Sequence, residues 1–362
     1  MMESPLGGMA SAPQPSQPPR RRRSWLYVTL GLLALLVCVA IIAITLGPLA
    51  LRRLGARPGS LLPSAPLVCP RAKASDAMPR DTTGQFTVQP VYAEVLSYAH
   101  DAEGQSDSQR VHLWSVDVLG QYPPMDDIFT EAVGGVDQWN TSLSAIDPSA
   151  FRCVTQDMQA GDVAGQALAT LRAAAKELPG PATTAYLVPW NTDKFYGASG
   201  EQSLLIPFWE PDPLNRNVTR DAATDWFYMP GALDHEYLEV VRYDRLGSEA
   251  NAYKTLLGNM VTDGLADNFA EHMTGKPIDW GISPSEEAAL WTQFQPTLTE
   301  YGNPNEPAEM LGDPAQGIPN AAGYAIGDHI VALYLQRHPG VTFNQLAGVD
   351  EQTIFDGSGY TG

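Results

Sequence analysis

Residues 234 to 239 read Asp-His-Glu-Tyr-Leu-Glu, a set of side chains that could hold a metal ion. In a helix, His235 and Glu239 lie one turn apart on the same face, so both can reach one ion. Imidazole nitrogen and carboxylate oxygen are ordinary zinc ligands. Glu236 lies between them and could polarise a water on that ion, as the glutamate does in the H-E-x-x-H helix of metalloproteases. Metal-assisted hydrolysis is the chemistry that this segment indicates.

A catalytic site of this kind needs a third protein ligand. Asp263 lies in a later helical segment, and an antiparallel pair of helices could bring it beside His235. However, an isolated HExxE pattern also arises by chance, and a histidine with two glutamates is an ordinary solvated face of a surface helix. The motif by itself leaves both interpretations open.

Two predicted helices must position these residues, and they span about residues 231–245 and 248–273. Other apolar spacings predict helices over residues 88–99, 111–119, 162–178 and 320–337, and β-strands over residues 183–190 and 202–209. Residues 202–208 are either an edge strand that pairs with extended peptide or a strand of the core. Gly323 and Gly327 are four residues apart and are expected to let their helix pack closely. The whole pattern predicts a helix-rich α+β fold with a small sheet.

Three segments of the second half of the chain carry a distinctive set of small, acidic and aromatic residues. They read HEYLEVVR over residues 235–242, TLLGNMVTDGLADNF over residues 255–269, and GIPNAAGYAIGDHIVALYL over residues 317–335. In these segments, their order and their spacing, the chain resembles a bacterial family of predicted Zn-dependent proteases of the gluzincin type. The resemblance covers about residues 88–360.

The resemblance implies a zincin-like α+β domain with a small mixed β-sheet, in which His235 is a zinc ligand and Glu236 the general base. The family has a second metal histidine where this chain has Glu239, and a glutamate where this chain has Asp263. Both replacements keep an oxygen ligand, so the site is altered rather than erased. Tyr324, in the third segment, could donate a hydrogen bond to a substrate oxyanion or pack in the core.

Two outcomes are compatible with the altered ligands. One histidine and two carboxylates can bind Zn²⁺ or a harder ion such as Mn²⁺ or Ca²⁺, with less acidification of the bound water. The protein is then a metallopeptidase (a hydrolase) that cleaves a peptide or protein substrate. Alternatively the site holds no metal, and the domain is an inactive peptidase-like module that binds a cell-envelope protein or peptide.

Residues 25–46 form an apolar run without a charged residue. At about 1.5 Å per residue a helix of this length reaches roughly 33 Å, enough to cross a hydrocarbon core of about 30 Å. A cleaved signal peptide has a shorter apolar core of about 7–15 residues. We therefore expect one transmembrane helix, a signal-anchor, over residues 25–46. It follows a disordered basic tail (1–24) and precedes a linker rich in Pro, Gly and Ser (47–84) and the peptidase-like domain (85–362).

Charge divides at this run. Residues 1–57 hold seven Arg and one Glu, a net charge of +6. Since the whole chain has a net charge of −19, the remaining residues have a net charge of −25. Four arginines (residues 20–23) directly precede the run, and the positive-inside tendency favours a cytoplasmic N-terminus and an extracytoplasmic domain at the cell membrane. An acidic domain repels DNA and RNA, so no nucleic-acid partner is expected. Cys69 and Cys153 could pair in an oxidising compartment.

Overall fold

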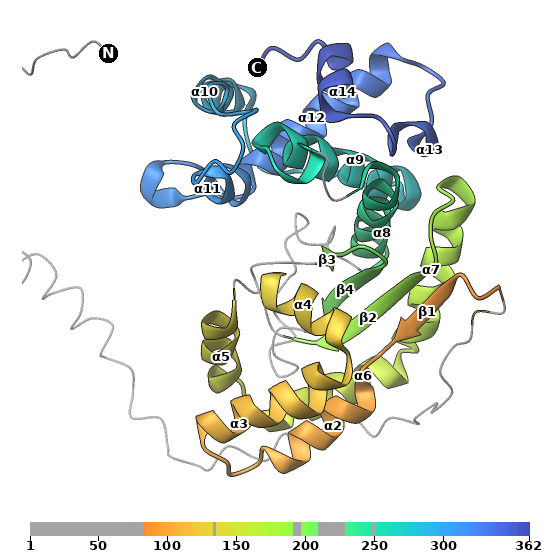
Figure 1. Cartoon of the computed structure of the whole chain (residues 1–362), viewed down its shortest axis with the longest axis vertical. Helices are drawn as coiled ribbons and strands as arrows, with labels where there is room; N and C mark the ends of the chain where they lie inside the picture. Colours follow the sequence, from red (N-terminus) through yellow and green to blue (C-terminus); the bar gives the residue numbers. More distant parts are fainter. Residues whose placement is uncertain (1–80, 82, 133–134, 191–196, 209–228, 248–250) are drawn as a thin grey trace, which may run out of the picture. The chain divides into compact units, whose positions relative to one another are not determined.

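The computed structural model describes residues 81–362, apart from residues 82, 133–134, 191–196, 209–228 and 248–250 (Figure 1). Its α-helices are α2 (Tyr92–Asp101), α3 (Asp107–Leu113), α4 (Pro123–Ala132), α5 (Val136–Ala145), α6 (Pro148–Ala160), α7 (Val163–Glu177), α8 (Met229–Leu246), α9 (Leu256–Thr274), α10 (Pro284–Phe294), α11 (Glu306–Leu311), α12 (Ala322–Arg337), α13 (Phe343–Leu346) and α14 (Glu351–Ser358). Shorter helical turns lie at Trp114–Val118, Leu119–Gln121, Asn251–Tyr253 and Pro314–Gln316.

A four-stranded sheet lies among these helices. Its strands are β1 (Phe86–Gln89), β2 (Thr183–Pro189), β3 (Ala198–Ser199) and β4 (Ser203–Phe208), and their spatial order is β1-β2-β4-β3. β1 and β4 run parallel to β2, whereas β3 runs antiparallel to β4, so the sheet is mixed. The described residues therefore confirm a helix-rich α+β fold with a small mixed sheet.

Helices cover both faces of the sheet. On β2, Ala185 and Leu187 belong to a core shared with α7, α8, α9 and α12. Their neighbours Tyr186 and Val188 belong to a second core, built with α2, α4 and the turn Trp114–Val118. Successive strand residues point to opposite faces, so burial on both faces requires an apolar residue at nearly every position. This explains the almost continuous apolar run of residues 183–190.

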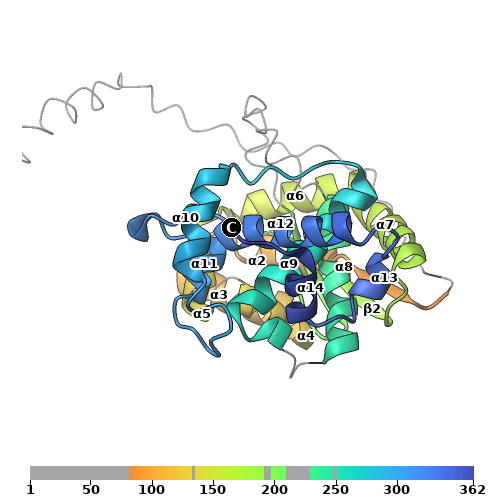
Figure 2. The ribbon, with the colours of Figure 1, turned by 90° about the horizontal axis from the view of Figure 1, so that it is seen from above.

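Helices α9 and α12 pack so closely that their backbones touch. A Cβ atom on Gly327 would lie 1.9 Å from the carbonyl oxygen of Met260, and one on Gly264 would lie 2.1 Å from the carbonyl oxygen of Gly327. Gly323 abuts Met310 of α11 in the same way. Figure 1 shows the sheet, α8, α9 and α12 in succession, and Figure 2 shows α12 lying over α9. The prediction that Gly323 and Gly327 allow close helix packing is confirmed.

Three predicted elements differ from the structure. The helix expected over residues 88–99 begins only at Tyr92, because residues 86–89 pair with β2 as strand β1. The helix expected from residue 248 begins at Leu256, where the Thr255 side chain caps it by accepting a hydrogen bond from the Gly258 N–H at 3.1 Å. The edge-strand interpretation of residues 202–208 is wrong, since β4 lies between β2 and β3 and the edge is β3.

Several predictions concern residues outside the described part of the chain. The membrane span over residues 25–46, the tail before it and nearly all of the linker after it lie there. Among the described helices, none is long and apolar enough to cross a membrane. Cys153, on α6, is disulfide-bonded. Cys69 lies outside the described residues, so its pairing with Cys153 stays a prediction.

Candidate metal site

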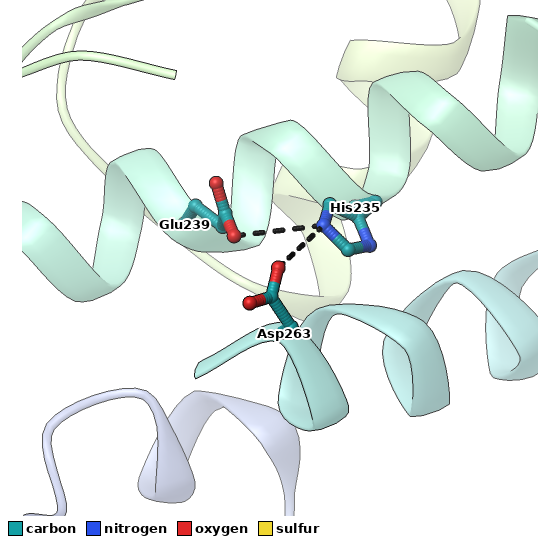
Figure 3. A group of neighbouring side chains, drawn as sticks. All are labelled: His235, Glu239 and Asp263. Carbon is teal, nitrogen blue, oxygen red and sulfur yellow. Dashed lines mark ion pairs between the residues drawn. The ribbon is translucent and has the colours of Figure 1, made fainter. Parts of the chain in front are cut away.

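The three predicted ligands meet between helices α8 and α9 (Figure 3). His235 and Glu239 lie one turn apart on α8, and the Nε2 atom of His235 is 3.5 Å from Oε1 of Glu239. Asp263 comes from α9, and its Oδ1 atom is 3.5 Å from the same Nε2. All three ligand atoms lie within 4.8 Å of one another. Two atoms that bind one zinc ion at about 2.1 Å with a tetrahedral angle lie about 3.4 Å apart, so the two distances from Nε2 fit a shared ion.

The core packing of α8 and α9 produces this convergence. The apolar residues Leu233, Tyr237 and Val241 of α8 are buried in the core that covers the sheet. His235 is also buried, and Figure 3 shows its ring directed toward Asp263 of α9. The two helices pack against each other along this side, which leaves little water to solvate a charge there. Charges in such a place must be paired with one another or with a metal ion.

A fourth acidic residue, Asp267, holds the histidine ring. Its Oδ1 atom is 2.9 Å from Nδ1 of His235, and the Asp267 side chain is completely buried. A carboxylate on Nδ1 fixes the orientation of the ring and directs Nε2 toward Glu239 and Asp263, an arrangement found at most metal-binding histidines. Sequence reasoning missed Asp267, although its spacing of four from Asp263 places both on one face of α9.

The protonation equilibria of the site reflect an excess of carboxylates. Burial opposes a positive charge on His235, but its carboxylate partners outweigh this effect and raise the pKa of the imidazole well above its ordinary value of 6.5. Burial raises the pKa of Asp263 to about 8. Burial also raises the pKa of Glu236, and the nearby charge of Glu239 raises it further. Protons on His235, Asp263 and Glu236 reduce the net negative charge of the site. A bound divalent cation would reduce it in the same way.

Two buried oxygen atoms of the site support the same conclusion. Within the described part of the chain, Oε2 of Glu236 and Oδ2 of Asp267 have no hydrogen-bond partner. A buried polar atom without a partner costs about 1–3 kcal/mol, and more when it is charged. Buried oxygen atoms without partners, next to His235, Glu239 and Asp263, are typical of a site that binds a cation and a water molecule. The residues present therefore fit a divalent metal ion.

Glu236 is held at the side of the site by the chain segment that leads into β3. Its side chain is buried, and Gly197 lies directly against it. A Cβ atom at position 197 would lie 2.2 Å from Oε1 of Glu236 and 2.7 Å from its carboxyl carbon. Only a residue without a side chain therefore leaves the Glu236 carboxylate where it is.

If this site hydrolyses peptides with Glu236 as its base, the substitution Gly197→Ala is expected to lower kcat/KM by about 10²-fold, because a displacement of about 1 Å at a catalytic group can have that effect. Metal affinity should remain, since the three atoms nearest to the added methyl group all belong to Glu236. Gly348→Ala is the control, because its Cβ would meet only the Arg245 side chain at 3.7 Å or more. Equal kcat/KM values for Gly197→Ala and the unchanged protein would show that the position of Glu236 does not matter.

Strand β3 also reaches Glu239. The Ser199 hydroxyl donates a hydrogen bond to Oε2 of Glu239 at 2.7 Å, while Oε1 is the oxygen that faces His235. Burial alone would raise the pKa of Glu239, but its hydrogen bonds with His235 and Ser199 lower it below its ordinary value. Glu239 is therefore the carboxylate of the site that most readily carries a negative charge. The sequence offered no signal for Ser199, because its contact joins residues 40 positions apart.

Tyr324, at the start of α12, lies near the same carboxylates. The negative charge of Asp263, followed by burial, raises the pKa of the Tyr324 hydroxyl well above 10. The hydroxyl therefore stays protonated and can donate a hydrogen bond. The Tyr324 ring packs on Trp280, with ring centres 5.4 Å apart. The structure thus brings Tyr324 to the site that holds His235, Glu236, Glu239 and Asp263, and at the same time packs it partly in the core.

A family model matches the part of the chain that carries these residues. Residues 213–356 match the model of the family described as Predicted Zn-dependent protease (DUF2268). The match includes α8, α9 and α12 and so every predicted site residue, and it confirms the resemblance noted from the sequence. No curated protein and no solved structure gave a significant match.

Proposed function

We propose that this protein is a membrane-anchored, metal-dependent peptidase that hydrolyses peptide bonds at the HExxE helix. The observation that carries the proposal is the convergence of His235, Glu239 and Asp263 on one point, with nitrogen and oxygen atoms spaced for a shared ion. The family to which residues 213–356 are similar is described as a predicted Zn-dependent protease, which supports the same reaction class.

His235, Glu239 and Asp263 would hold the ion, which when bound would supply a Lewis acid that makes water a nucleophile near neutral pH. Glu236 is the general base. Without an ion its raised pKa favours a proton on the carboxyl group, but the positive charge of a bound ion would lower that pKa again. The carboxylate lies beside the ligands and has one oxygen without a partner in the described structure, so it could then accept the proton of the attacking water. It can then return that proton to the leaving amine. Tyr324 keeps its proton and can donate a hydrogen bond to the carbonyl oxygen as negative charge develops there.

The donor set suggests which ions the site accepts. Two carboxylates and one imidazole neutralise a divalent cation fully, whereas two histidines and one glutamate leave one positive charge. Carboxylate-rich sites suit harder ions such as Mn²⁺ better than histidine-rich sites do. We propose Zn²⁺ or Mn²⁺ as the working ion, with a smaller acidifying effect on water than in a site with two histidines.

The place of action follows from the sequence alone. The apolar run of residues 25–46 would anchor the protein in the cell membrane, with the acidic domain on the extracytoplasmic side and peptides or proteins of that compartment as substrates. Digestion of intact cells with an added protease tests this orientation. Survival of the domain until the cells are lysed would contradict it.

Metal analysis of the purified full-length protein tests the proposal. We expect about one divalent ion per chain, and we expect a chelator to lower the thermal unfolding midpoint, because an ion present at 100 times its Kd stabilises the folded state by about 2.7 kcal/mol. The protons held by His235 and Asp263, the latter with a pKa of about 8, must leave when the ion binds. Affinity should therefore fall toward acid and still be rising with pH near 8, where Asp263 loses its proton.

His235→Ala should abolish stoichiometric binding, and His100→Ala, which changes an exposed histidine on α2, should leave it intact. A full-length protein that binds no divalent ion at neutral pH would contradict the peptidase proposal. The domain would then be a binding module for an envelope protein or peptide.

A further inference from the structure

Strand β3 contacts both functional parts of the site. Gly197, just before the strand, lies against the general base Glu236, and Ser199, at its end, bonds to the ligand Glu239. Among the hydrogen bonds of the described residues, Ser199 supplies the hydroxyl group on the Glu239 carboxylate, whereas the Tyr253 hydroxyl donates to the Glu239 backbone carbonyl at 3.4 Å. β3 comes from a part of the sequence about 40 residues before the HExxE helix and outside the matched family segment.

The hydrogen bond from Ser199 makes the two carboxylate oxygens of Glu239 different in their contacts. Oε2 accepts the serine hydroxyl at 2.7 Å, and Oε1 is 3.5 Å from Nε2 of His235, on the side where Asp263 converges. A free carboxylate can bind a metal through one oxygen or through both. With Oε2 held by a hydroxyl group, only Oε1 is directed at the point where His235 and Asp263 converge.

The position of Ser199 is itself fixed by the sheet. Ser199 pairs with Leu204 of β4, and the tight turn between the strands is closed by the hydrogen bond from the Gly200 N–H to the Ser203 carbonyl at 2.8 Å. β4 in turn lies in the interior of the sheet and packs on α8. The serine hydroxyl is therefore presented to Glu239 by backbone that cannot easily move away.

We propose that Ser199 is a positioning residue that holds Glu239 as a one-oxygen metal ligand, an inference that rests on the proposed metal site. A histidine at position 239 would present one ring nitrogen and would need no such hydroxyl. A glutamate has three rotatable bonds and two equivalent oxygens, so its use as a ligand requires a second group that selects one of them. Ser199 supplies that group, and it tunes the coordination number of the ion as well as the affinity.

The test uses the full-length protein, loaded with Zn²⁺ for affinity and with Co²⁺ as a spectroscopic probe. Ser199→Ala should weaken Zn²⁺ binding by about 10–100-fold, the usual effect of removing a partner of a metal ligand. The visible absorption of the Co²⁺ form should lose intensity, because a two-oxygen glutamate raises the coordination number. Ser199→Thr keeps the hydroxyl and should restore both the affinity and the spectrum.

Ser203→Ala removes a hydroxyl from the neighbouring strand β4 and should leave affinity and spectrum as they are in the unchanged protein. If Ser199→Ala binds Zn²⁺ as tightly as the unchanged protein and gives the same Co²⁺ spectrum, Ser199 has no positioning role, while the peptidase proposal stands. A Ser199→Thr protein that stays as impaired as Ser199→Ala would also overturn the inference. If the unchanged protein binds neither ion, the proposed function fails and this inference fails with it.

Discussion

Replacing Glu236 with glutamine is expected to lower kcat/KM for peptide cleavage by about 10²–10⁴-fold, the range for loss of a general base. Glutamine has nearly the shape of glutamate but cannot accept a proton from water at neutral pH. Glu236 contributes none of the three converging ligand atoms, so the ion should stay bound with unchanged stoichiometry. Cleavage of a peptide library followed by mass spectrometry gives the rate, and elemental analysis gives the metal content.

A matched control separates this effect from a general loss of acidic charge. Glu201→Gln makes the same chemical change at an exposed residue in the turn between β3 and β4, and it should leave kcat/KM unaltered. If Glu236→Gln kept full activity with its metal bound, another group would have to be the base. If Glu236→Gln lost its metal, Glu236 would have to be counted among the ligands.

The substitution Gly327→Ala is expected to have the largest effect on stability. Its Cβ atom would lie 1.9 Å from the carbonyl oxygen of Met260, which belongs to the backbone of α9 and cannot rotate away. Alanine improves helix propensity by about 1 kcal/mol over glycine. Forcing two packed helices apart costs typically about 1–3 kcal/mol and occasionally more. This cost should exceed the gain in helix propensity, so the substitution should lower the free energy of unfolding. Urea unfolding of the purified protein measures the net loss.

Because α9 carries Asp263 and α12 carries Tyr324, separation of these helices should also weaken metal binding. Gly348→Ala is the control for stability, since its Cβ would make only ordinary contacts with a flexible arginine side chain. A Gly327→Ala protein as stable as the unchanged one would mean that α9 and α12 do not pack with their backbones in contact.

Most of the helices and both long strands could be predicted from the sequence, because they depend on local regularities. Helical spacing of apolar residues located α8 and α12 to within two residues at each end. Where prediction failed, a distant partner decided the outcome. Residues 88–89 belong to a run with helical spacing, yet they end strand β1 because β2 offers residues 86–89 a ladder of backbone hydrogen bonds nearly 100 residues later.

The candidate site divides in the same way. The spacing of His235, Glu236 and Glu239 within one helix was evident from the sequence, because residues four apart share a face whatever the rest of the fold does. Asp263 was a candidate because an antiparallel pair of helices could bring it beside His235, and the resemblance to a family whose model matches this segment supported it. These residues determined the kind of chemistry that this chain can support.

The tertiary structure decided how those residues are held. Asp267 on the Nδ1 atom of His235, Gly197 against Glu236 and Ser199 on Glu239 all depend on contacts between elements that pack together only in the folded chain. No local pattern encodes such contacts, since they arise from the packing of α9 on α8 and from the place of β3 at the edge of the sheet. The sequence by itself determined which atoms could bind a metal, and the fold alone determined which oxygen of Glu239 faces His235 and which accepts the Ser199 hydroxyl.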